Sequence, residues 1–433
     1  MPPHILLIPD KYNWILGTIS KQIVQYNPEY HFAYSTRPEV LASPSKVIEL
    51  SRNIDVIHWV LDLEFYENLP IELKRFPKQI ASVHHVLNWE KAQKCREAAL
   101  IHVVSQEWKD FLIDKGIDEE RIWLIPNGID IARFNPDTPC NEARKKLTLP
   151  ESAFIVGFLG SAFPTSRERK GVDTFIAACN ILASQIPELV VFISGQYWDD
   201  DVKKLRANGI KVIHPGYLSD QKLPLAYRAM DVFIVAGTVE GGPVTAFEAL
   251  ASGIPLVSTP VGMVRDGVED GKQALIFSAN NVDEMASNVM WIYCDGALSR
   301  NLRINGPLLI REKYQWKDIA PRYGKLYAQL ADPPSESYLN QRTDPFINQR
   351  LHELKMDKAI LISKSLQNGK WRVASDLFLD DHGSFLSSIS VLLLVVKNLI
   401  SPYLQRSIEL VKRLIPSGIK NWLKLRIKAN GTN

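Results

Sequence analysis

The segment from Thr238 to Glu248 reads TVEGGPVTAFE and follows the apolar run Val232–Val235. A short run of this kind is typical of a buried strand. Pro243 stands where a helix tolerates proline, in its first turn. The segment therefore predicts a strand that ends, a loop that carries two glycines, and the beginning of a helix.

The two glutamates of this segment are spaced to suit one extended ligand. The N-terminus of a helix presents free N–H groups and a positive dipole end, which favour a diphosphate. Glu240 precedes that terminus and Glu248 lies within the helix, so the two carboxylates can reach different hydroxyls. The alternative interpretation is an acidic residue that favours the helix dipole, followed by an ordinary helical glutamate.

Outward from this segment, short apolar runs alternate with amphipathic stretches in two series. Such alternation is typical of βαβ units and a parallel sheet. The first series of expected strands is Ile5–Ile8, Val56–Val60, Ile80–His84, Ile101–Val104 and Trp123–Ile125. The second is Phe154–Leu159, Val190–Ile193, Val212–Ile213, Val232–Val235 and Leu256–Ser258. Two doubly wound sheets would place ligands at the carboxyl ends of their strands, between the domains.

Length and composition agree with two globular domains. A chain of 433 residues is long for one core, and 46% hydrophobic with 23% charged residues is a globular composition. The net charge of +3 gives no reason to expect nucleic acid as a partner. The four cysteines are scattered and form no CxxC pair, which favours a reducing compartment over disulfides or structural zinc. The first residues resemble a strand more than a signal peptide.

Beyond residue 330 the composition changes. Residues 331–383 begin with a polar, proline-bearing segment and are expected to form a linker or extension. Residues 384–433 combine apolar helix faces with many basic residues, a pattern typical of helices that lie on a membrane surface. A helical pair packed on the body, with a solvated basic face, is the alternative. The excess of basic over acidic residues favours membrane contact.

Several motifs in order resemble those of family-4 retaining glycosyltransferases. The glutamate segment resembles their E-x7-E donor site, and Lys170-Gly171-Val172-Asp173 and Tyr314-Gln315-Trp316 are similar to further family motifs. Ile125-Pro126-Asn127-Gly128 stands at the expected domain junction. The resemblance covers roughly residues 80–330. It implies an α/β chain of GT-B fold, with two Rossmann-like domains that face an interdomain cleft and a C-terminal helical extension. The domains are expected at residues 1–140 (acceptor side) and 141–306 (nucleotide-sugar side), with a crossover helix over 307–330 that returns to the first domain.

The resemblance also implies roles for individual residues. Glu240 and His84 would be catalytic, with His84 near the anomeric centre of the sugar, and Lys170 would hold the phosphates. The alternative interpretation is a structural role for His84 and a solvated surface charge for Lys170. The residues expected to bind substrate are Gly17, Arg169, Lys170, Tyr217, Gly241, Gly242, Pro243, Val244, Thr245 and Glu248.

The sequence departs from the family pattern at three places. An arginine usually follows the glycine at the end of the first strand of the second domain, where this chain has Gly160-Ser161. Arg167 and Arg169, in a longer loop, are both candidates to replace that arginine, and Arg169 is preferred. Asp266 stands where the family often has glutamate, and it either alters which hydroxyls are contacted or ends a loop. Gly17 is a single glycine where the family often has two.

The resemblance predicts a metal-independent retaining enzyme that needs no cofactor. It would move a sugar from a nucleotide-diphosphate sugar to a glycan or lipid-linked acceptor, in cell-surface polysaccharide or glycoconjugate synthesis. The enzyme is expected in the cytoplasm, with peripheral membrane contact through residues 384–433 and no nucleic-acid partner. The alternatives are a nucleotide-sugar epimerase of the same fold and a catalytically degenerate sugar-nucleotide-binding protein that acts through its basic tail. A nicotinamide dehydrogenase is disfavoured because neither first strand precedes a G-x-G-x-x-G.

Overall fold

The computed structural model describes residues 2–12, 14–61 and 68–331 as two parallel six-stranded sheets with flanking helices. The order of the first sheet is β2-β1-β3-β4-β5-β6, and that of the second is β12-β11-β10-β7-β8-β9. Both orders reverse beside the first strand of the sheet, β1 or β7. Ligands of doubly wound sheets bind outside the carboxyl ends of the strands at this switch point. The linker expected at 331–383 (apart from Ala331) and the basic helices expected at 384–433 lie outside the described residues.

The strands of the two sheets are short and mostly buried. In the first sheet they are β1 (His4–Ile8), β2 (His31–Tyr34), β3 (Val56–Trp59), β4 (Gln79–Val83), β5 (Leu100–Val103) and β6 (Ile122–Leu124). In the second they are β7 (Phe154–Leu159), β8 (Leu189–Ser194), β9 (Lys211–Ile213), β10 (Val232–Val235), β11 (Leu256–Ser258) and β12 (Ala274–Ile276). Every residue of β4, β8 and β10 is buried, as expected for strands covered by helices on both faces.

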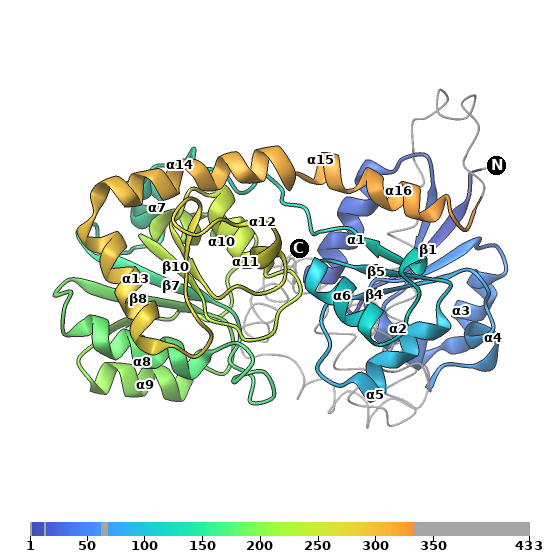
Figure 1. The fold of residues 1–433 in the computed structure, drawn as a ribbon, viewed down its shortest axis with the longest axis horizontal. Coiled ribbons are helices and arrows are strands. Elements are labelled where there is room, and N and C mark those ends of the chain that lie inside the picture. The colour runs from blue at the N-terminus through green and yellow to red at the C-terminus, as the bar shows by residue number, and fades with distance from the viewer. Residues whose placement is uncertain (1, 13, 62–67, 332–433) are drawn as a thin grey trace, which may run out of the picture.

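Helices cover both faces of each sheet (Figure 1). Those of the N-terminal half are α1 (Ile15–Tyr26), α2 (Arg37–Ala42), α3 (Pro44–Ser51), α4 (Ile71–Lys74), α5 (Trp89–Ala92) and α6 (Gln106–Asp114). Those that follow are α7 (Cys140–Lys146), α8 (Val172–Ala183), α9 (Asp199–Ala207), α10 (Lys222–Ala229), α11 (Val244–Ala251), α12 (Met263–Gly267), α13 (Val282–Cys294), α14 (Gly296–Lys313), α15 (Trp316–Ile319) and α16 (Pro321–Tyr327). Strands β2 and β12 were not among the expected elements. The short α5 is followed directly by a 3₁₀ turn, Gln93–Glu97.

The chain passes between the two halves twice, and the two passages lie side by side. The amide of Ile129 donates to the carbonyl of Tyr314 at 2.7 Å, and Ile129 forms an isolated parallel bridge with Gln315. The ring of Trp316 fills the position that a β-carbon on Gly128 would need. Two of the motifs quoted from the sequence are therefore in direct contact, although 185 residues lie between Gly128 and Tyr314 in the numbering.

Helices α15 and α16 return the chain to the first sheet (Figure 1, orange). The side-chain amide of Asn27 donates to the carbonyl of Ala320 at 2.9 Å, and the hydroxyl of Tyr30 donates to the carbonyl of Gly324 at 2.7 Å. The segment 307–330, expected as one crossover helix, is the end of α14 followed by these two short helices.

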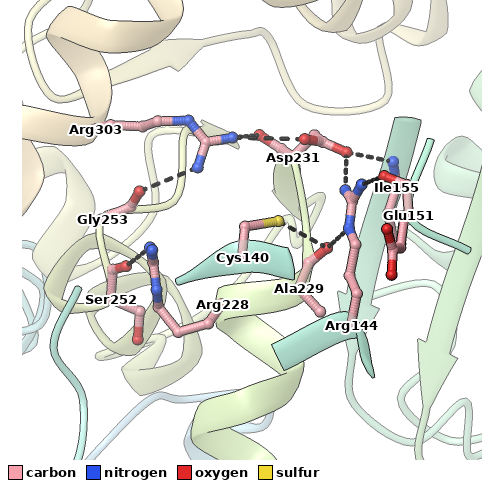
Figure 2. Close-up of polar contacts among 10 residues, drawn as sticks. All are labelled: Cys140, Arg144, Glu151, Ile155, Arg228, Ala229, Asp231, Ser252, Gly253 and Arg303. Atoms are coloured by element: carbon pink, nitrogen blue, oxygen red, sulfur yellow. Dashed lines mark hydrogen bonds and ion pairs between the residues drawn. The ribbon is translucent and has the colours of Figure 1, made fainter. Parts of the chain in front are cut away.

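Three arginines, Arg144, Arg228 and Arg303, connect helices of the second half through hydrogen bonds to backbone carbonyls (Figure 2). Arg144 pairs with Asp231 at 2.5 Å and donates to the carbonyl of Ala229, at the end of α10. Arg228 and Arg303 donate to the carbonyls that end α11. Cationic side chains at helix C-termini satisfy carbonyls that have no partner within the helix. The cluster thus joins α7, α10, α11 and α14 beneath the second sheet, at the amino ends of its strands.

No helix in the described part of the chain combines the length and apolar character needed to cross a membrane.

Candidate functional site

The Glu240 loop, residues 237–243, joins β10 to α11 and has backbone packed against it on two sides. A β-carbon on Gly241 would overlap the carbonyl oxygen of His84, and one on Gly262 would overlap the carbonyl oxygen of Gly241. Gly262 also has φ of +46°, where other residues are strained. The amide of Met263 donates to the carbonyl of Gly241 at 2.9 Å. Glycine is required at both positions because two backbone segments touch at each.

Two basic side chains, Arg169 and Lys170, converge on Glu240; we call them the basic pair. Oε1 of Glu240 lies 2.7 Å from Nη1 of Arg169 and 3.5 Å from Nζ of Lys170. Nη1 of Arg169 also donates to the carbonyl of Val239 at 2.9 Å. All three charged side chains are less than one-third exposed. Two cations share one carboxylate here, which leaves an excess of positive charge beside the N-terminus of α11.

The loop between β7 and α8 holds the basic pair in this position. Gly171 has φ of +62°, and a β-carbon there would overlap the carbonyl of Ala236, just after β10. The amide of Thr238 donates to the carbonyl of Arg169 at 2.7 Å. The two loops are therefore joined through their backbones, which places both cations beside Glu240. Nε of Arg169 is buried and has no hydrogen-bond partner among the described residues.

Arg167 lies in the same loop but is held away from the basic pair. Its guanidinium contacts Asp173 at 2.6 Å and Asp201 at 2.7 Å. The hydrogen bonds that Arg167 donates to Asp201 and Asp173 raise the pKa of its guanidinium. Asp201 belongs to α9 and its side chain is only 6% exposed. Arg167 thus links its loop to α9, and of the two candidates only Arg169 contacts Glu240.

Glu248 is buried in α11, away from bulk solvent. The hydroxyl of Tyr227 donates to Oε2 of Glu248 at 2.7 Å. Burial raises the pKa of Glu248 to about 7, although the hydrogen bond from Tyr227 and the charge of Arg133 both act to lower it. A buried carboxylate with one remaining oxygen is suited to accept hydrogen bonds from a ligand that excludes water. Tyr227 was not expected from the sequence, since it occupies an ordinary position of an amphipathic helix.

Tyr217 lies within the electrostatic reach of Arg133, Asp220 and Glu248. Nη2 of Arg133 pairs with Asp220 at 3.0 Å. Burial of the Tyr217 hydroxyl, and then the charges of Asp220 and Glu248, raise its pKa, although the residue as a whole is 73% exposed. Arg133 follows the junction motif and Asp220 precedes α10, so only the folded chain brings these two residues together.

The two candidates from the N-terminal half, His84 and Gly17, have close backbone neighbours in different places. His84 directly follows β4, and its carbonyl contacts Gly241. Its Nε2 lies 3.3 Å from the carbonyl of Val60, which makes that nitrogen the donor. Gly17 lies buried in the first turn of α1, where a β-carbon would overlap carbonyl oxygens of Lys11 and Tyr12 in the preceding loop.

Two further residues contact the Glu240 loop from the N-terminal half. Nε1 of Trp108 donates to the carbonyl of Glu240 at 3.2 Å. The Asn127 side-chain nitrogen lies 2.6 Å from the β-carbon position of Gly242, and its buried Oδ1 has no hydrogen-bond partner among the described residues. Asn127 belongs to the quoted junction motif, so its presence near the site had a sequence signal. Trp108 had no such sequence signal, because an aromatic residue on an amphipathic helix is equally consistent with a place in the hydrophobic core.

Within the part of the chain that the structure describes, no three histidine, cysteine or carboxylate side chains gather as the ligands of a metal ion.

Two family models match this chain, and they divide it as the two sheets do. The model described as Glycosyltransferase Family 4 matches residues 13–133. The model described as Glycosyl transferases group 1 matches residues 140–308. Together the two matches cover more than half of the 433 residues. The chain belongs to glycosyltransferase family 4.

Curated relatives of this family-4 chain are named for different products. Mannosylfructose-phosphate synthase of Agrobacterium fabrum is 29% identical over 224 residues, 49% of this chain and 48% of the relative. The lipopolysaccharide core biosynthesis mannosyltransferase LpsB of Rhizobium meliloti is 29% identical over 171 residues, 37% of this chain and 48% of the relative. The chain thus spans about half the length of these relatives.

Solved structures place this family-4 chain in the GT-B fold. A crystal structure of Anabaena HepE in complex with UDP-glucose superposes with a TM-score of 0.63, at 19% identity over 75% of this chain and 100% of HepE. At this identity the similarity establishes the fold alone.

Proposed function

We propose that this protein is a retaining glycosyltransferase that moves a sugar from a nucleotide-diphosphate sugar to an acceptor hydroxyl without a metal ion. The observation that carries the proposal is the convergence of Arg169 and Lys170 on Glu240, beside the N-terminus of α11. Positive charge and free backbone N–H groups at one place suit a diphosphate. A carboxylate at the same place suits the hydroxyls of the sugar attached to that diphosphate.

The charge of the basic pair supports a specific role in the reaction. As the bond between the anomeric carbon and the phosphate oxygen breaks, its electron pair leaves with the nucleoside diphosphate. The acceptor oxygen bonds to the same face of that carbon, and its proton passes to the departing phosphate oxygen. Preorganised cations at the growing negative charge stabilise the transition state more than the ground state. Arg169 and Lys170 would supply that charge in place of a metal ion.

The other site residues follow from their positions relative to this pair. Glu248 would accept hydrogen bonds from the ribose hydroxyls, and the exposed Tyr217 would lie beside the nucleotide base. The backbone at Gly241, Gly242, Pro243, Val244 and Thr245 would meet the diphosphate or the sugar. His84 would face the anomeric centre from the N-terminal half, since its carbonyl contacts Gly241. Gly17 would let the loop before α1 approach the phosphates.

For the acceptor, we propose a cell-surface glycan or a lipid-linked saccharide, reached at the cytoplasmic face of a membrane. The basic helices expected at 384–433 motivate this, since basic residues are attracted to anionic lipids. A relative named for lipopolysaccharide core biosynthesis is consistent with such an acceptor. Removal of 384–433 should reduce both recovery with membranes and transfer to a lipid-linked acceptor.

The donor is tested by incubating the purified protein with a panel of nucleotide-diphosphate sugars. We expect at least one donor to release its nucleoside diphosphate, by transfer or slow hydrolysis, with mass spectrometry as the readout. EDTA in a parallel series should leave the release unchanged. A panel in which no donor is consumed, with or without candidate acceptors, would favour the non-catalytic sugar-nucleotide-binding protein instead.

The two arginines of one loop form a matched pair of variants. Arg169→Ala removes a cation from Glu240 and should lower kcat/KM about 10- to 100-fold, because a charge at the leaving group is lost. Arg167→Ala removes the ion pairs with Asp173 and Asp201, so it should lower the thermal unfolding midpoint while kcat/KM stays close to wild type. Steady-state kinetics and calorimetry measure both effects. Equal activity losses in the two variants would contradict the assignment of Arg169.

A further inference from the structure

Helix α6 of the N-terminal half begins without a cap of its own. Ser105 is its N-cap residue, but the Ser105 hydroxyl is buried and makes no hydrogen bond among the described residues. The first helical amide, that of Gln106, instead donates to Oδ2 of Asp266 at 2.7 Å. Asp266 belongs to α12 in the other half of the chain. A carboxylate that accepts a first-turn amide stabilises a helix terminus, and here it also joins the two halves.

The same two helices are joined a second time in the opposite direction. Glu107 of α6 accepts a hydrogen bond from the amide of Gly262, which precedes α12, at 2.9 Å. Nη1 of Arg265 lies 3.4 Å from the other oxygen of Glu107. Each helix therefore receives a carboxylate from the other across the interface between the halves. Gly262 has a positive φ at this contact, a backbone conformation that other residues rarely adopt.

These contacts reach the backbone of the Glu240 loop. Trp108, next to Glu107 on α6, donates to the Glu240 carbonyl at 3.2 Å, and its side chain is almost fully buried. On the other side, the Met263 amide donates to the Gly241 carbonyl at 2.9 Å. The loop is thus attached directly to α6. It is also attached to α12, which is itself bound to α6 through Asp266 and Glu107. Since a loop has no hydrogen-bond ladder of its own, such outside attachments determine where its carboxylate stands.

We propose that Glu107, Trp108 and Asp266, the α6–α12 clamp, are positioning residues that hold the Glu240 carboxylate at the reacting sugar. This rests on the proposed function of Glu240. None of the three needs to touch the substrate. Asp266, where the family often has glutamate, accepts the Gln106 amide in this arrangement and needs no contact with a sugar hydroxyl. Misplacement of a reacting group by about 1 Å can cost about 100-fold in rate, so loss of the clamp acts mainly on kcat.

The test uses the full chain and two side-chain changes at one position. Asp266→Ala removes the acceptor for the Gln106 amide and should lower kcat about tenfold or more, with the KM for the donor changed much less. Asp266→Asn keeps an oxygen that can accept this hydrogen bond and should recover most of the lost kcat. Trp108→Phe keeps the ring but loses the donor to Glu240 and should resemble Asp266→Ala. Glu119→Gln, which removes an ion pair of α6 within its own half, is the matched control and should leave kcat unchanged.

A second readout needs no substrate. Deuterium exchange of peptides that contain Gln106 and residues 238–243 should be faster in Asp266→Ala than in wild type, and unchanged in Glu119→Gln. Unchanged exchange in Asp266→Ala would overturn the clamp, and faster exchange with unchanged kcat would overturn its role in positioning. If wild type transferred no sugar, the proposed function would fail, whereas the exchange data would still decide whether the clamp holds the loop. Circular dichroism of each variant verifies that it is folded.

Discussion

Replacing Glu240 with glutamine is expected to lower kcat for sugar transfer by about 10²–10³-fold. The carboxylate has two roles in the proposed site. It accepts hydrogen bonds from hydroxyls of the donor sugar, and its Oε1 lies 2.7 Å from Nη1 of Arg169 and 3.5 Å from Nζ of Lys170. The amide keeps the size of the side chain but loses its charge. Arg169 and Lys170 then have no carboxylate between them to offset their charge. The affinity for the nucleoside diphosphate product should therefore equal that of wild type or exceed it.

Steady-state kinetics and calorimetric titration of the nucleoside diphosphate measure these two quantities separately. Glu269→Gln is a suitable control, since Glu269 pairs with Lys272 on the exposed surface of the same half of the chain. It should leave both quantities unchanged. A Glu240→Gln variant that transfers sugar at the wild-type rate would show that the site residues are assigned wrongly. A variant that loses affinity for the diphosphate in parallel with kcat would show that Glu240 supports the basic pair and has no role at the sugar.

The second large effect is expected in stability at mildly acidic pH. A chain of hydrogen bonds crosses three strands of the first sheet and runs from Tyr327 in α16 to the carbonyl of Ile125. Its members are His58, Ser82 and His102, which are completely or almost completely buried. The four heavy-atom distances are 2.9, 2.9, 2.8 and 2.8 Å, in order from Tyr327 to Ile125. We call this the histidine chain.

The carbonyl of Ile125 at one end determines which atom donates and which accepts in every hydrogen bond of the histidine chain. A carbonyl only accepts, so Nε2 of His102 must donate to Ile125, and the neutral ring then accepts at Nδ1 from the Ser82 hydroxyl. Ser82 in turn accepts from Nε2 of His58, which leaves Nδ1 of His58 to accept from Tyr327. Every ring nitrogen is occupied when both histidines are neutral. An additional proton would place a donor where an acceptor is needed.

The sign of the pH effect follows from these pKa values. Burial lowers the pKa of His102 to about 3, and burial with the nearby charge of His102 lowers the pKa of His58 well below 6.5. Because the folded values lie below the unfolded value of about 6.5, the unfolded chain binds more protons below that pH. The stability is therefore complete above about pH 6.5 and is lost as the pH falls toward about 3. At pH 5 the loss is about 2 kcal/mol for His102, and protonation of His58 acts in the same direction.

Denaturant unfolding at pH 7.5, 6 and 5 measures this loss. The double variant His58→Gln/His102→Gln should be less stable at pH 7.5, because a hydrogen-bonded network is broken, but should lose much less additional stability between pH 7.5 and 5. His214→Asn removes a histidine of the other half and tests whether the effect belongs to the histidine chain. Equal slopes with pH for wild type and the double variant would contradict neutral burial of the pair.

The pattern of apolar runs predicted most of the two sheets because parallel strands are buried on both faces. Phe154–Leu159 and Val232–Val235 match their observed strands residue for residue. Strand β2, His31–Tyr34, escaped prediction because it is short, at the sheet edge and carries a histidine and a tyrosine. Strand β12, Ala274–Ile276, has only three residues, too few to show a period.

The candidate site was predictable where its residues adjoin in sequence and unpredictable where they meet only in the fold. Glu240 and the glycines after it were evident from one segment. The sequence favoured Arg169 over Arg167 but gave no geometric reason, because side chains two residues apart in a loop of irregular backbone can point to opposite sides. Tyr227 and Trp108 resemble core residues in the sequence, and only their partners, Glu248 and the Glu240 carbonyl, distinguish them.

What the sequence determined by itself is the α/β class, the division into two series of strands, and membership of a known family, since these depend on periodicity and on motifs local to the chain. Only the tertiary structure decided how the residues far apart in sequence meet. Arg169 reaches Glu240 because Gly171 lets two loops touch, and Asp266 caps α6 because the two halves pack against each other. Such contacts depend on distances of a few ångströms between separate segments, which no pattern along one segment contains.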